Sequence, residues 1–394
     1  MEAIPETVAL CGGRVVLPDR VLAPAGVLLR GGRIAAVGTF AVPAGARVID
    51  AAGGLILAGF IDVHLHGGGG SDFMDGTPES LRRIARTHCL HGTTAMAPTT
   101  LSCPYEEMQR FFALYRDAAA QSDTAELLGI HLEGPYISQQ MRGAQNPAWI
   151  RSPTPAETER LLHDGEGLLA RCSCAPEAEG VPALAAALRE AGVLLAVGHS
   201  NATCEQTLAA WEQGFRHVTH LYCATPGIRK IGQHVHGGVV EAAYLLDDMT
   251  VELIGDGCHV PPEVIRLAVK CKGPDRVLLI TDAMRAAGTE VKESFLGTDR
   301  PENRVIIEDG VAKLPDRSSF AGSIATMDAV FRNARQAVGL PLPVITRLMS
   351  LNPARHLGVE GRKGSLAVGK DADVLVLDAQ DRIAHVFARG REIT

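Results

Sequence analysis

The stretch Leu194-Leu-Ala-Val-Gly-His199 is a short apolar run that ends in a histidine, and its pattern decides the fold because it recurs along the chain. Other apolar runs end in side chains that can bind a metal or transfer a proton: His64 and His66, Glu133, His220, Asp256 with His259, and Asp282. Helical patterns alternate with these runs, at residues 79–91, 105–120, 183–191 and 205–213. Continuous apolar strands that alternate with helices are typical of a parallel sheet covered on both faces.

The polar strand ends indicate how this sheet is closed. Polar residues at the C-terminal ends of parallel strands meet at one point when the strands form a barrel, whereas an open, doubly wound sheet would not gather them. The sequence therefore predicts an α/β protein with a TIM-like (β/α)8 barrel at residues 59–354. Short β-rich runs with Gly and Pro between them occupy residues 7–57 and recur from Gly364. They predict a small β-sandwich domain built from both termini, residues 1–58 and 355–394.

The composition restricts the partners and the compartment. The 394 residues are 46% hydrophobic and 21% charged, and the net charge is −7 without a basic cluster, so we expect a large core and no nucleic-acid partner. The N-terminus lacks the features of a signal peptide, and no apolar run reaches the ~20 residues that span a bilayer. The nine cysteines are scattered, as expected for reduced thiols. We therefore expect a cytoplasmic protein without membrane contact.

The candidate metal site begins with His64 and His66, which are two residues apart and project to the same face of an extended strand. A His-x-His pair alone is a weak signal, because single histidines more often have a structural role. The signal strengthens because equivalent strand ends carry further candidates: Glu133, His199, His220 and Asp282. Imidazole and carboxylate groups suit zinc, iron or a similar divalent ion.

Eight motifs along the chain carry a resemblance to a known family. They are Gly59-Phe-Ile-Asp-Val-His-Leu-His-Gly, His131-Leu-Glu-Gly-Pro-Tyr, Val197-Gly-His-Ser, Thr219-His-Leu, Asp256-Gly-Cys-His-Val, Ile280-Thr-Asp-Ala, Ala321-Gly-Ser and Asn352-Pro-Ala-Arg. Together they resemble the N-acetylglucosamine-6-phosphate deacetylase family of the amidohydrolase superfamily. The motifs run in the family's order over almost the whole chain.

The resemblance implies a function and a role for each candidate residue. Glu133, His199 and His220 would bind the principal ion, and His64 and His66, with Asp282, would hold a second, so that one or two zinc or iron ions are expected. The ion would activate water, and Asp282 would take the proton of that water and pass it to the leaving amine. The expected substrate is an amino sugar, N-acetylglucosamine 6-phosphate, and the expected assembly is a homodimer. The residues expected to contact the substrate are Ala144, Gln145, Cys223, Ala224, Arg229, Lys230, His259, Phe320, Ala321 and Gly322.

Two substrate segments depart from the family pattern. Cys223 stands where an asparagine is expected, and Gln145 stands where a histidine is expected. The loop at residues 227–238 is longer than usual, so Arg229 and Lys230 are only candidates for the contact with phosphate. These departures keep two alternatives open: a deacetylase of another N-acetylhexosamine or N-acyl compound, and a barrel protein without catalytic activity. Retention of every metal-binding and proton-transferring candidate argues against the second alternative.

Overall fold

Two parallel sheets form the centre of the computed structural model, which describes residues 7–119 and 122–394. The smaller sheet has the order β10-β9-β6 and contains β6 (Phe60–Leu65), β9 (Thr93–Pro98) and β10 (Glu126–Leu127). The larger sheet has six strands in chain order: β11 (Ile130–Glu133), β12 (Leu169–Cys174), β13 (Leu194–Val197), β14 (Phe215–Val218), β17 (Thr250–Ile254) and β18 (Val277–Ile280). Parallel bridges from Thr99 to His131 and from Leu65 to Ala283 connect the two sheets at both edges. The predicted parallel α/β architecture is confirmed.

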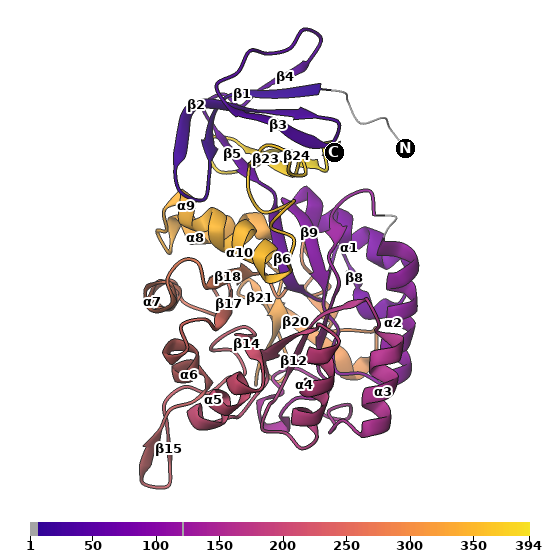
Figure 1. Ribbon diagram of the computed structural model, residues 1–394. Helices are drawn as coiled ribbons and strands as arrows, with labels where there is room; N and C mark the ends of the chain where they lie inside the picture. The colour runs from indigo at the N-terminus through magenta and orange to yellow at the C-terminus, as the bar shows by residue number, and fades with distance from the viewer. Residues whose placement is uncertain (1–6, 120–121) are drawn as a thin grey trace.

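Helices follow most of these strands and lie outside them (Figure 1). Their bounds are α1 (Pro78–Leu90), α2 (Tyr105–Ala118), α3 (Pro155–Asp164), α4 (Val181–Glu190), α5 (Cys204–Glu212), α6 (Val239–Leu245), α7 (Pro262–Lys272), α8 (Met327–Gln336), α9 (Leu342–Thr346) and α10 (Asn352–His356). Local sequence sets several starts: the side chains of Thr77, Thr154 and Thr203 accept hydrogen bonds from backbone N–H groups in the first turns of α1, α3 and α5. The four predicted helices correspond to α1, α2, α4 and α5, although residue 120 of the second lies outside the described residues.

One strand of the larger parallel sheet, β12, was not predicted. Its sequence, Leu169-Ala-Arg-Cys-Ser-Cys, places Arg171 and Ser173 within the run. Both side chains are buried, because they belong to a polar network between the strands that is described below. A buried polar network of this kind removes the continuous apolar pattern that a sequence search for buried strands relies on.

The two terminal segments share one sheet of eight strands, which lies at the top of Figure 1. It contains β1 (Thr7–Val16), β2 (Val21–Arg30), β3 (Arg33–Gly38), β4 (Arg47–Asp50), β5 (Leu55–Ala58), β23 (Val374–Leu377), β24 (Ile383–Ala388) and β25 (Arg391–Ile393). The segments meet where β5 pairs antiparallel with β23, with Ala58 opposite Val374. A separate apolar core that includes Leu10, Val27 and Val376 belongs to this sheet. The exact domain boundaries and the sandwich form remain predictions.

Three insertions complete the described chain. An antiparallel sheet of four short strands follows β18: β19 (Glu293–Phe295), β20 (Arg304–Glu308), β21 (Val311–Lys313) and β22 (Phe320–Ser323). A hairpin of β15 (Arg229–Ile231) and β16 (His234–His236) extends beyond the helices at the lower left of Figure 1. A third, smaller pair joins β7 (Gly67–Gly68) to β8 (Ser71–Asp72). Within the described residues, no helix has the length and apolar character needed to cross a membrane.

Candidate metal and active site

The candidate ligands lie at the carboxyl ends of the parallel strands. Glu133 is the last residue of β11, whereas His199, His220 and Asp282 each follow the end of β13, β14 or β18 by two residues. These last three have positive φ angles of 48°, 29° and 50°, respectively. Such left-handed backbone is unfavourable for residues other than glycine and persists where the surrounding structure enforces it, which is common at functional sites. The turn after each strand thus aims its side chain at a common point.

The side chains of this group converge on Glu133. Its Oε1 atom lies 3.0 Å from His220 Nε2, 3.2 Å from His199 Nε2 and 3.4 Å from His64 Nε2. His66 Nε2 lies 3.3 Å from the other oxygen of Glu133. Asp282 Oδ1 lies 3.3 Å from His64 Nε2 and 3.2 Å from His66 Nε2. The six residues predicted from strand ends are therefore brought together, and all six are buried.

The opposite ring nitrogens show how three histidines are oriented. His199 Nδ1 lies 2.8 Å from the carbonyl oxygen of Met141, and His220 Nδ1 lies 2.9 Å from that of Cys223. Because a carbonyl oxygen only accepts hydrogen bonds, each Nδ1 carries a proton, and each Nε2 is the nitrogen that faces the site and could bind an ion there. His64 is held in the same way, with Nδ1 2.6 Å from Glu252 Oε1. Metal-binding histidines in proteins are typically held by such hydrogen bonds from the nitrogen that faces away from the ion.

Two observations show that this donor set fits a metal ion. Two groups, His64 with His66 and Glu133, and Glu133 with His199 and His220, each place three ligand atoms within 4.8 Å of one another. The Nε2 atom of His64 is fully buried and has no hydrogen-bond partner. A buried polar atom without a partner is costly, so its position within this donor set favours coordination. Nitrogen and oxygen donors of this kind suit zinc or iron.

The carboxylates of the site are held in their charged form. Burial by itself would raise the pKa of Glu133, but the charge of His64 and hydrogen bonds from His199 and His220 hold that pKa well below its usual range. Burial likewise opposes ionisation of Asp282, yet the charge of His64 and a hydrogen bond from His66 lower its pKa. A charged Asp282 can accept a proton at neutral pH, as its expected role requires.

A buried network of charged residues contacts His64 at Nδ1, the nitrogen that faces away from the candidate metal site. Glu252 of β17 is fully buried, and its Oε2 atom lies 2.6 Å from Nη1 of Arg171, which is 1% exposed. Burial opposes the charge on Glu252, but Arg171 and His64 keep its pKa well below the usual range. Arg171 also donates to His131 Nδ1 at 2.8 Å, and His217 Nε2 lies 3.1 Å from Glu252 Oε2. Glu252 thus neutralises a buried guanidinium with one oxygen and orients a candidate ligand with the other.

A cavity of about 300 Å³ opens over the candidate ligands. His66, Glu133, His199, His220 and Asp282 line it, and so do most of the predicted substrate contacts: Ala144, Gln145, Cys223, Ala224, His259, Phe320 and Gly322. Ala321 is fully buried beside this wall without lining the cavity. Because the predicted ligands and the predicted substrate contacts share one cavity, it is the candidate active site.

The family model described as the amidohydrolase family matches residues 55–393. The chain belongs to the amidohydrolase family. Among individual relatives, the N-acetylglucosamine-6-phosphate deacetylase of Lysinibacillus sphaericus is 33% identical over 366 residues, covering 93% of this chain and 92% of that protein. The N-acetylgalactosamine-6-phosphate deacetylase of Escherichia coli O157:H7 is also 33% identical, covering 86% of this chain and 87% of that protein.

A solved structure agrees with these relatives. A mutant N-acetyl-D-glucosamine-6-phosphate deacetylase of Mycobacterium smegmatis, in complex with N-acetyl-D-glucosamine-6-phosphate, is 35% identical to this amidohydrolase. Its TM-score is 0.89, with 99% of this chain and 100% of that chain covered. The resemblance that the sequence motifs indicated is therefore confirmed.

Two predicted substrate residues lie away from the cavity of this amidohydrolase. Arg229 and Lys230 belong to strand β15 of the protruding hairpin and do not line the cavity. The guanidinium of Arg229 instead donates to the carbonyl oxygen of Asn201 at 2.7 Å and contacts its side-chain oxygen. Within a single chain the hairpin thus leaves the cavity without these two cations.

The two residues that depart from the family pattern both line the cavity. Gln145 accepts a hydrogen bond from the backbone N–H of Ser102 at 2.7 Å and donates one to Glu133 Oε2 at 3.1 Å. Its amide therefore holds the oxygen of Glu133 that faces His66. Cys223 supplies a carbonyl acceptor to His220, a role that depends on the backbone and not on the side chain.

His259 is fixed by its neighbours in the turn. Asp256 Oδ2 lies 2.7 Å from His259 Nδ1, and Asp256 Oδ1 accepts hydrogen bonds from the backbone N–H groups of Cys258 and His259 at 2.9 Å. The ring of Phe320 lies edge-on to His259, with centroids 4.8 Å apart. Asp256 thus closes the turn, as its Asp-Gly sequence predicts, and also orients the His259 ring.

Proposed function

We propose that this chain is a metal-dependent deacetylase that hydrolyses N-acetylglucosamine 6-phosphate to glucosamine 6-phosphate and acetate. The observation that carries the proposal is the convergence of Glu133, His199 and His220 beside an ionised Asp282 in one cavity. The relatives with the same reaction in their names, which align over nearly the whole chain, support the substrate class. A linear amide bond between an acetyl group and an amino sugar is the bond to be broken.

The residues of the site have separate roles in amide hydrolysis. Glu133, His199 and His220 would hold a divalent ion, which when bound lowers the pKa of a coordinated water towards ~7 and polarises the acetamide carbonyl. Asp282 accepts a proton from the attacking water and returns it to the sugar nitrogen as the C–N bond breaks. The oxygen of the water ends in acetate, and the amine leaves with the proton. His259 is oriented by Asp256 and lies in the cavity wall, where it would contact the sugar.

The proposal also covers the form of the two domains, the metal ions, the compartment and the assembly. We infer that the two parallel sheets, joined by bridges at both edges, form a closed (β/α)8 barrel, and that the terminal sheet is a small β-sandwich domain with boundaries near residues 58 and 355. The ion is zinc or iron. His64 and His66, with Asp282 and Glu133 beside them, would hold a second ion. A cytoplasmic homodimer fits the composition and the family.

A second candidate is deacetylation of another N-acetylhexosamine phosphate. The observations that favour it are Gln145 and Cys223 in the wall of the cavity, where the glucosamine enzymes usually have histidine and asparagine. The galactosamine relative matches this chain with the same 33% identity as the glucosamine relative. Both candidates use the same ligands and the same Asp282, so they differ only in how the sugar is recognised.

A substrate panel tests the proposal. Purified enzyme of measured metal content is assayed on N-acetylglucosamine and N-acetylgalactosamine, each with and without the 6-phosphate, and acetate release is followed. We expect the highest kcat/KM for N-acetylglucosamine 6-phosphate. A higher value for the galactosamine phosphate would select the second candidate. Absence of acetate release from all four sugars by metal-loaded enzyme would contradict both candidates.

The phosphate contact has its own test. The backbone N–H of Ala224, in the cavity wall, can donate a hydrogen bond to phosphate, whereas that of Cys223 is bonded to the carbonyl oxygen of His220. Arg229 and Lys230 remain the predicted cations, and because they lie outside the cavity of their own chain, they would reach phosphate from the second copy in the proposed homodimer. We expect replacement of Arg229 and Lys230 by alanine to lower the ratio of kcat/KM for the phosphorylated sugar to kcat/KM for the unphosphorylated sugar. The main cause should be a higher KM for the phosphorylated sugar. An unchanged preference would assign phosphate recognition to other groups.

A further inference from the structure

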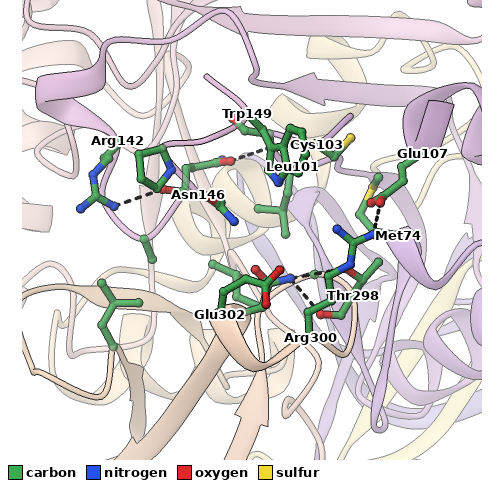
Figure 2. Close-up of a pocket in the computed structure, with 18 residues that line it drawn as sticks. Met74, Leu101, Cys103, Glu107, Arg142, Asn146, Trp149, Thr298, Arg300 and Glu302 are labelled. Atoms are coloured by element: carbon green, nitrogen blue, oxygen red, sulfur yellow. Dashed lines mark hydrogen bonds and ion pairs between the residues drawn. The ribbon is translucent and has the colours of Figure 1, made fainter. Parts of the chain in front are cut away.

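A second cavity of about 280 Å³ adjoins the active-site cavity (Figure 2). Four residues line both cavities: Leu101, Ala144, Gln145 and Leu296. Among the described residues that carry the proposed chemistry or face the sugar in the proposed function, only Ala144 and Gln145 also line it. The proposed reaction therefore leaves this space without a role.

The position of the reacting bond indicates which part of a substrate reaches this space. The acyl carbonyl must lie beside Glu133, His199 and His220, and the nitrogen must lie within reach of Asp282. The sugar then follows the nitrogen towards His259 and Phe320. The acyl substituent then faces the rest of the wall, whose large apolar side chains are Leu101, Tyr222, Ile254 and Leu296. Of these, Leu101 and Leu296 also line the second cavity.

Part of the wall of the second cavity is apolar: it includes Met74, Leu101, Cys103, Leu296 and Leu314, beside polar side chains such as Asn146, Thr298 and Glu302. Figure 2 shows Leu101 and Cys103 between Arg142 on one side and Arg300 on the other. Arg300 forms an ion pair with Glu107, and Arg142 donates to the carbonyl oxygens of Gly143 and Gln145 at 3.4 and 3.2 Å. An uncharged alkyl chain that follows the apolar part of this wall would leave the ion pair of Arg300 with Glu107 intact.

The segment at Leu296 and Gly297, which lines the second cavity, is held in place by hydrogen bonds within the protein. The carbonyl oxygen of Gly297 accepts a hydrogen bond from Arg285 at 2.7 Å, and its N–H donates to Asp72 at 3.1 Å. Arg285 is in turn paired with Asp75. A space whose wall is fixed before the ligand arrives requires little reorganisation to be filled.

We infer that the second cavity receives the distal carbons of acyl groups longer than acetyl, so that the enzyme also hydrolyses N-propionyl and N-butyryl amino sugar phosphates. This inference rests on the proposed function. The reaction is the same: water supplies its oxygen to the acyl carbon, the C–N bond breaks, and the amine takes the proton. The products are propionate or butyrate and the free amino sugar phosphate.

An acyl series tests the inference on the metal-loaded enzyme. We expect kcat/KM for N-butyrylglucosamine 6-phosphate to lie within about tenfold of the value for the acetyl substrate, because each added CH2 gains an apolar contact. A butyryl value more than tenfold below the acetyl value would overturn the inference while leaving the deacetylase proposal intact. Failure to hydrolyse the acetyl substrate itself would count against the proposed function instead.

A variant that fills the cavity gives the second test. Leu314 is half-buried and lines only the second cavity, so Leu314→Trp should block the distal space without touching the candidate ligands. We expect at least a tenfold fall in the butyryl-to-acetyl ratio of kcat/KM, with the acetyl value unchanged. Leu314→Phe serves the same purpose should the tryptophan impair folding. Leu267→Trp on α7, at a site that is 48% exposed, is the matched control. An unchanged ratio in both Leu314 variants would show that acyl chains do not enter this cavity.

Discussion

Replacing Glu252 by glutamine should weaken metal binding and destabilise the fold, because this one side chain serves two buried partners. One of its oxygens lies 2.6 Å from His64 Nδ1, and the other lies 2.6 Å from Arg171 Nη1. Glutamine keeps the shape of glutamate but has only one oxygen. Whichever way the amide turns, its NH2 group faces either the donor of His64 or the donors of Arg171.

The magnitude follows from the burial of both partners. Arg171 is 1% exposed and Glu252 is fully buried, so loss of the carboxylate leaves a guanidinium without its counter-charge. Breaking a buried pair in this way typically costs about 3–5 kcal/mol of unfolding free energy, out of roughly 5–15 kcal/mol for a domain. Loss of the group that orients a metal-binding histidine typically lowers metal affinity by about 10–100-fold. We expect both effects in Glu252→Gln.

Two measurements separate the contributions. Urea unfolding of chelated protein reports the loss of the buried contacts of Glu252 without any contribution from metal binding. Metal titration with mass spectrometry of bound ions reports the orientation of His64. Replacing both partners by apolar residues, Arg171→Met with Glu252→Leu, should recover much of the lost stability, because no charge is left buried without a partner. It should not recover metal affinity. Lys363→Met, which removes the buried ammonium that pairs with Asp373 and Glu126 far from the candidate ligands, is the control that loses stability without losing metal. Wild-type metal affinity in Glu252→Gln would refute the proposed orientation of His64.

Three further outcomes are expected. Asp282→Asn should lower kcat on the order of a hundredfold or more with an unchanged unfolding midpoint, and near-normal turnover would move the proton transfer to another group. Chelation should abolish acetate release, and zinc or iron should restore it; a fully active protein shown by metal analysis to be metal-free would end the metal hypothesis. Burial opposes ionisation of Glu126, but Arg362 and Lys363 lower its pKa from 4.5 to about 2. Because the folded pKa is the lower one, this stabilisation is complete above pH 4.5 and is lost as the pH falls towards 2. Acid unfolding of Glu126→Gln should therefore depend less on pH in that interval than that of the wild type, and identical curves would contradict the assignment.

The sequence predicted the parts of the fold that have a local signature. Apolar runs and helical periodicity identified α1, α2, α4, α5 and most of the parallel strands, because burial on both faces leaves a continuous apolar pattern. The strand β12 was not predicted because Arg171 and Ser173 interrupt that pattern. Their burial depends on partners in other strands. The antiparallel strands β19 to β22 escaped because they are three to five residues long and are defined only by their pairing.

The candidate ligands could be predicted because each lies at the end of an apolar run. Its position in the sequence is enough to place it at the carboxyl end of a parallel strand. Glu252 could not be recognised in this way, since it lies inside β17, and its role appears only when His64 and Arg171 are seen beside it. The placement of Arg229 depends on the path of a hairpin, which residue types alone do not determine. The positive φ angles of His199, His220 and Asp282 likewise arise from tertiary constraint, because each is a non-glycine residue.

The pairing of β5 with β23 has a consequence for how the chain is made. Ala58 meets Val374 across this pair, so the strand on one side of β5 emerges from the ribosome roughly 300 residues after β5 itself. At translation rates of about 5–20 residues per second, the edge of β5 stays open for roughly 15–60 s. An unpaired edge is a template for wrong partners, and this one is followed directly by β6, which carries His64. Newly made chains should therefore depend on chaperones most strongly during the interval before the last strands are synthesised.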